Sequence, residues 1–218
     1  MYFVSLALAS LIQQGGIAVP PPAKFVVGSS IKRSGTITAQ PCDSPEKMTK
    51  SVILTSSPKS IGKDGVQLTV VNMAPEGEKG GSFSLKTTSR GIPLSCAAIG
   101  ETDDGQGITF LLLYMRQPLW PATKKAGSWT VTLPNPINEK TKAMKVACQV
   151  RTAPGKPSLL LLEEKSDSME LAVGGSMQAV SKLEVDARTG AVLSVHESLD
   201  IYAGGKKVQM MTYVEGSN

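Results

Sequence analysis

The chain has 218 residues, 41% of them hydrophobic and 19% charged, which is ordinary globular composition and excludes a disordered or fibrous chain. A chain of this length buries enough apolar surface to fold without disulfides, and it suits one all-β domain or two small ones. The formal net charge is +5, and a single histidine is present, so a histidine-based metal cluster is excluded.

The first twelve residues, MYFVSLALASLI, are mostly apolar and carry no charged side chain. This length matches the core of a secretory signal peptide and is too short to span a bilayer. Ala7-Leu8-Ala9 has the form of a cleavage site, although a later cut would leave a more normal apolar core. We therefore predict a signal peptide over residues 1–16 and an extracytoplasmic protein, which is periplasmic, envelope-associated or secreted. A buried N-terminal strand or helix is the alternative. No other segment is long enough to be transmembrane.

Residues 17–23 contain three consecutive prolines, Pro20 to Pro22, which favour a stiff extended linker. We therefore expect one β-rich domain over residues 24–216, or two β subdomains that divide near residue 118.

The positive charge is concentrated near the start of this domain. Residues 24–63 contain seven basic and two acidic residues, which accounts for the whole net charge. Such a patch suits an anionic partner, for example an envelope surface, and a solvated face is the alternative. Only Phe25 interrupts the charges with an aromatic ring, so we expect no nucleic-acid binding. The candidate residues of this anionic-partner patch are Lys24, Lys32, Arg33, Lys47 and Lys50.

Short β-type segments bounded by glycine or proline follow one another through the middle of the chain. Residues 66–73 and 82–88 read as strands, and in the second Phe83 and Leu85 share one face. Residues 108–115, ITFLLLYM, are apolar on every side, and we expect either a central strand or a strand that lies under a covering element.

Residues 176–186, 191–201 and 206–214 read as three strands of a β-meander joined by glycine-containing turns. Glu197 interrupts the apolar stripe of the second strand. Together these patterns predict a mainly β protein with few short helices, built on a curved antiparallel sheet that is half-barrel or β-sandwich-like.

Catalytic motifs are lacking. The sequence has none of the common nucleophile, phosphate-binding or zinc-protease signatures, so we expect no enzyme activity, cofactor or metal. His196 alternates with Val195 and should face solvent. Glu163 and Glu164 point to opposite faces of a strand, and both are predicted to be surface charge. Cys42, Cys96 and Cys148 form no metal-binding pair; either two of them form a disulfide or all three stay reduced.

Two aromatic residues, Trp120 and Trp129, flank a loop with proline and glycine. Either they anchor that loop to the core, or they line a ligand cavity. Methionines such as Met177 and Met210 would suit an adaptable apolar binding surface.

Residues 119–121 (LWP) and 127–131 (GSWTV), followed by the hairpin 183–193 (LEVDARTGAVL), resemble segments of uncharacterised bacterial extracytoplasmic domains. The same hairpin style is similar to that of lipoprotein carriers of the LolA/LppX type. This resemblance covers residues 119–214, and it implies an open half-barrel whose concave apolar face holds an acyl chain. We therefore expect a non-catalytic binding module for a lipid or an acylated peptide. The alternative is a structural or interaction protein of the cell envelope without a small ligand.

Overall fold

The computed structural model describes residues 16–100, 106–135, 143–171 and 174–216. The predicted signal peptide, residues 1–16, therefore lies outside the described residues except for Gly16.

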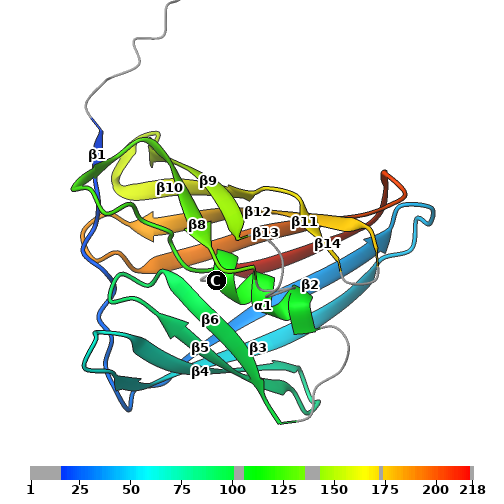
Figure 1. Cartoon of the computed structure of the whole chain (residues 1–218), viewed down its shortest axis with the longest axis horizontal. Helices are drawn as coiled ribbons and strands as arrows, with labels where there is room; N and C mark the ends of the chain where they lie inside the picture. The colour runs from blue at the N-terminus through cyan, green and yellow to red at the C-terminus, as the bar shows by residue number, and fades with distance from the viewer. Residues whose placement is uncertain (1–15, 101–105, 136–142, 172–173, 217–218) are drawn as a thin grey trace, which may run out of the picture.

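Within these residues, one antiparallel sheet of twelve strands curls around one helix, α1 (Gln106–Met115) (Figure 1). The prediction of a mainly β protein with a curved antiparallel sheet is confirmed. Strands β6 and β8 are the free edges, and β14 pairs with β2, so the strands before and after residue 118 belong to one sheet. In sheet order the strands are β6 (Pro93–Ile99), β5 (Gly81–Thr87), β4 (Gln67–Pro75), β3 (Met48–Ile61), β2 (Ile31–Pro41), β14 (Lys206–Gly216), β13 (Val192–Ala203), β12 (Ser176–Asp186), β10 (Lys156–Ser166), β9 (Met144–Ala153) and β8 (Ser128–Leu133), with β11 (Met169–Glu170) paired to β12.

Alternation of apolar and polar residues explains the strands of the C-terminal meander. Strand β12 alternates buried and less buried side chains along its length, and the buried ones face the helix side of the sheet. The turn to β13 is held by Asp186 Oδ1, which accepts hydrogen bonds from the backbone N–H groups of Arg188 and Thr189 at 3.0 and 2.7 Å. Gly190 closes this turn with φ of 71°, a conformation that glycine adopts most easily. The predicted strands and turns of this region are confirmed.

The expectation of a central strand over residues 108–115 is wrong, because this segment lies in helix α1. Residues 111–115 are all buried on the concave side of the sheet. A run that is apolar on every side has neither the helical nor the strand period, so periodicity could not distinguish the two structures. The curved sheet requires apolar material on its concave side, and residues 111–115 of the helix supply it.

The proline segment packs on the domain. Strand β1 (Ile17–Ala18) pairs with β7 (Lys125–Ala126), and Val19 N–H donates to the carbonyl of Lys124 at 3.0 Å. A Cβ added to Gly190 would collide with the carbonyl oxygen of Pro21. Residues 17–23, which their prolines predict to be a stiff extended segment, therefore lie against the rest of the fold.

The strand register defines two ends of the curved sheet. We call one end the mouth; it is formed by the segment 19–30, which crosses it (Figure 1), and by the turns 62–66, 88–91, 154–155 and 187–190. The opposite end is formed by the turns 42–47, 76–80 and 204–205.

Candidate ligand-binding site

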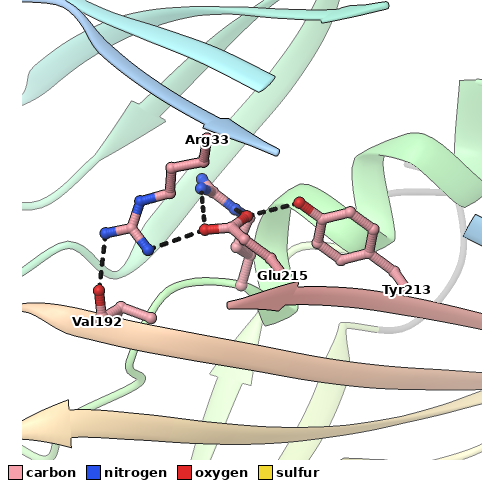
Figure 2. Close-up of polar contacts among 5 residues, drawn as sticks. Arg33, Val192, Tyr213 and Glu215 are labelled. Atoms are coloured by element: carbon pink, nitrogen blue, oxygen red, sulfur yellow. Dashed lines mark hydrogen bonds and ion pairs between the residues drawn. The ribbon is translucent and has the colours of Figure 1, made fainter. Parts of the chain in front are cut away.

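A buried carboxylate, Glu215 on β14, holds two arginines near the mouth (Figure 2). Arg116, directly after α1, donates from Nε to Oε2 at 2.7 Å and from Nη2 to Oε1 at 2.8 Å. Arg33 on β2 donates from Nη1 to Oε1 at 2.8 Å and from Nη2 to the Val192 carbonyl at 2.7 Å. The Tyr213 hydroxyl donates to Oε2 at 2.5 Å. This cluster joins three segments that are far apart in the sequence.

Gly35 on β2 leaves space for the side chain of Tyr213 in this cluster. Gly35 lies directly opposite Glu215 in the pairing of β2 with β14. A Cβ at Gly35 would come within 2.6 Å of the Tyr213 ring, so a larger residue would displace this ring. The absence of a side chain on β2 therefore allows Tyr213 to lie where its hydroxyl reaches Glu215.

The charges in this cluster determine the protonation states of Glu215 and Arg116. Burial alone would raise the pKa of Glu215, but hydrogen bonds from Arg116 and Tyr213, with the charge of Arg33, hold it below the usual value. Burial also disfavours the charged form of Arg116, and the hydrogen bonds and charge of Glu215 outweigh this effect and raise its pKa. Glu215 is therefore an anion between two cations.

A row of polar residues continues from Tyr213 across the concave face. Glu197, Ser181 and Glu164 follow it in register on β13, β12 and β10. Glu164 Oε1 accepts a hydrogen bond from the backbone N–H of Leu119 at 2.7 Å. The other carboxyl oxygen of Glu164, both oxygens of Glu197 and the Ser181 hydroxyl have no hydrogen-bond partner among the described residues.

Both of these glutamates are fully buried, and burial raises the pKa of each well above its usual value. Arg116 lowers the pKa of Glu197 in part, whereas the charges of Glu164 and Glu215 raise it further. The prediction that Glu164 is surface charge is wrong, although Glu163 is exposed and the opposite orientation of the two side chains is confirmed.

A cavity of about 250 Å³ lies at the mouth, and Arg33 and Arg116 form part of its wall. Most of the remaining lining is apolar. A second cavity of about 370 Å³ adjoins it and shares Pro22, Arg90 and Trp120 with it. The apolar side chains that line the first cavity include Phe25, Ile31, Val71, Leu85, Trp120 and Val192.

The two tryptophans lie together beside this cavity. Their ring centroids are 5.9 Å apart with an interplanar angle of 23°. Trp129 Nε1 donates to the Leu119 carbonyl at 2.8 Å, and Trp120 is buried and lines both cavities at the mouth. The predicted methionines are elsewhere: Met177 is 1% exposed in the core, and Met210 lies on the other face of β14 from the buried Tyr213.

The predicted anionic-partner patch is divided by the fold. Lys24 and Lys32 are exposed near the mouth, whereas Lys47 and Lys50 are exposed near the opposite end of the β2–β3 hairpin. Arg33 points to the concave side and pairs with Glu215. These five residues therefore do not form one surface.

Other candidate chemical groups are dispersed. His196 is exposed on β13, as predicted. Cys42, Cys96 and Cys148 are free thiols; burial raises the pKa of Cys96 to about 12 and that of Cys148 still higher, which makes both poor nucleophiles. In the part of the chain that the structure describes, no group of three or more histidine, cysteine, aspartate or glutamate side chains could hold a metal ion.

Sequence reasoning missed the network of Arg116, Tyr213 and Glu215. The one available signal was Glu197, an acidic residue within an apolar stripe, which is buried in register with Tyr213 beside this network. No known family model and no curated protein matches the chain. None of the described helices is long and apolar enough to cross a membrane.

Proposed function

We propose that this protein is a non-catalytic binding module that holds an apolar or acylated ligand with an anionic group in the cavity at the mouth. The observation that carries the proposal is the pair of guanidinium groups, Arg33 and Arg116, on the wall of a mainly apolar cavity. Apolar walls with a few placed polar groups are typical of small-molecule sites, because the walls supply affinity and the polar groups supply orientation.

The local charge balance favours an anion. Two guanidinium groups face the single carboxylate of Glu215, and the raised pKa values of Glu164 and Glu197 favour their neutral forms. The cluster therefore keeps one positive charge beside the cavity. The side chain of Arg33 is 28% exposed, so an anionic group can approach it without opening the core. An arginine presents a planar fork that suits a carboxylate or a phosphate.

The test is native mass spectrometry of freshly purified protein, followed by titration with a fluorescent fatty acid and with the matching fatty alcohol. We expect a co-purified lipid, and we expect Arg33→Met to weaken fatty-acid binding about tenfold while changing alcohol binding little. Lys182→Met, on the exposed face of β12, is the matched control and should bind both probes like the unchanged protein.

A protein that carries no lipid and binds neither probe would instead favour the alternative, a structural or interaction protein of the envelope. The alternative is supported by the concave side of the sheet, where buried residues of helix α1 pack with the core side chains of the strands. If Arg33→Met weakens the binding of the fatty acid and of the fatty alcohol equally, then Arg33 shapes the cavity rather than binding the anionic group.

The proposal places the protein outside the cytoplasm, where an envelope lipid or an acylated peptide would be its ligand. Its support is the apolar sequence of residues 1–12. A fusion of residues 1–23 to a reporter that matures only after export should give active reporter. Replacing Leu6 and Leu8 with arginine should abolish the signal by interrupting the apolar core, and an inactive unchanged fusion would contradict export.

A further inference from the structure

Exposed aliphatic side chains gather at the mouth. Val26, Val27, Ile31 and Ile61 are 55, 52, 51 and 53% exposed. They lie on neighbouring parts of the fold, because Gly28 N–H donates to the Pro58 carbonyl at 3.1 Å and Ile31 pairs with Ser56 on β3. Of the four, Ile31 lines the cavity, together with the neighbouring Phe25 and Pro58.

The charges around this aliphatic surface are mostly positive. The mouth, taken with Lys32, Lys59, Lys156, Glu184 and Asp186 beside its segment and turns and with Lys124 and Lys125 beside the segment 17–19, carries nine exposed basic residues against three acidic ones, Asp64, Glu184 and Asp186. The turns 42–47, 76–80 and 204–205 at the opposite end, with the adjoining Lys206 and Lys207, carry four acidic and four basic residues. The excess of positive charge therefore lies at the mouth. The nine basic residues are Lys24, Lys32, Lys59, Lys63, Arg90, Lys124, Lys125, Lys156 and Arg188.

We infer that the mouth is a docking surface for an anionic lipid bilayer. Lysines interspersed with aliphatic side chains suit a lipid interface, where the aliphatic groups enter the headgroup region and the cations meet lipid phosphates. Protein interfaces are instead enriched in aromatic residues and depleted in lysine. Seven of the nine cations at the mouth are lysines, and its most exposed apolar residues are valine and isoleucine, so the composition favours a membrane over an acidic protein.

This inference goes beyond the proposed function, because the docking surface does not depend on a ligand in the cavity. Arg33 and Arg116 lie on the cavity wall together with Lys24, Arg90 and Ile31 of the mouth, whereas Val26, Val27, Lys59 and Lys63 do not line the cavity. Substitutions at these four residues therefore test membrane binding without changing the cavity wall. If both hold, the cavity opens toward the bilayer, and an amphiphile would have a short path between membrane and protein.

The experiment is flotation of the purified protein with phosphatidylcholine vesicles, with and without phosphatidylglycerol. We expect binding only to the vesicles with the anionic lipid, and we expect high salt to weaken it strongly. Removing two charges with Lys59→Gln and Lys63→Gln should weaken binding about 30-fold. Replacing Val26 and Val27 with serine should weaken it about tenfold, and this loss should persist in high salt.

The matched control is Lys47→Gln with Met48→Ser at the opposite end, where Met48 is 64% exposed and Lys47 is exposed. This control and Arg33→Met should float like the unchanged protein. The absence of flotation, or equal losses from both ends, would overturn the inference while leaving the fatty-acid titration unaffected. If the protein floats with the anionic vesicles but does not bind the fatty acid, only the proposed function is contradicted.

Discussion

Replacing Arg116 with methionine is expected to lower the free energy of unfolding by about 3–5 kcal/mol. Arg116 is 8% exposed and makes two hydrogen bonds to Glu215, which is itself 1% exposed. Methionine keeps much of the side-chain volume and removes the charge. Glu215 would then be a buried carboxylate with only Arg33 as a countercharge. Urea unfolding at neutral pH, followed by circular dichroism, measures the change.

Two further variants separate the charge from the packing. Arg33→Met should cost less, about 1 kcal/mol, because the side chain of Arg33 is partly solvated. The double change Arg116→Met with Glu215→Gln should recover part of the loss, because it leaves only the partly solvated Arg33 without a countercharge. The losses of unfolding free energy in Arg116→Met alone and in Glu215→Gln alone are the comparison. If their sum equals the loss in the double variant, the two residues are not coupled, which would contradict this interpretation.

Much of the fold is predictable because its signals are local. The turn after β12 depends on Asp186, Thr189 and Gly190, which lie close together in the sequence. The side chain of Asp186 accepts hydrogen bonds from Thr189, and Gly190 adopts a positive φ. Likewise, the alternation of Phe83 and Leu85 with polar residues determines which face of β5 is buried. Period and turn chemistry require no knowledge of distant segments, and so these predictions are confirmed.

The helix and the candidate site depend instead on distant segments. Residues 108–115 are compatible with a strand or a helix until the sheet that encloses them is known. Glu215 reads as an ordinary C-terminal acidic residue until β14 pairs with β2 and brings it to Arg33, a sequence separation of 182 residues. Apart from Lys24 and Lys32, the basic residues of the mouth were missed for the same reason, because Arg90, Lys156 and Arg188 come together only through the strand register.

The stability of the protein should pass through a maximum in mild acid, because its buried carboxyl groups respond to pH in opposite directions. The pKa of Glu215 is lowered in the folded protein, so its contribution is present above the unfolded pKa of about 4.3 and is lost as the pH falls through the folded value. The pKa values of Glu164 and Glu197 are raised. Their contributions are complete below the unfolded pKa and are lost as the pH rises through the folded values.

Glu197→Gln tests the alkaline side of this profile. Glutamine keeps the shape of the side chain but cannot ionise, so the variant should lose much of the decline in unfolding free energy between pH 5 and pH 9. Its acid side should stay unchanged, because Glu215 is still present. Urea midpoints measured across this range give the profile. Glu163→Gln, on the exposed face of β10, is the control and should follow the unchanged protein. A Glu197→Gln profile parallel to that of the unchanged protein would show that Glu197 does not hold a proton in the folded state.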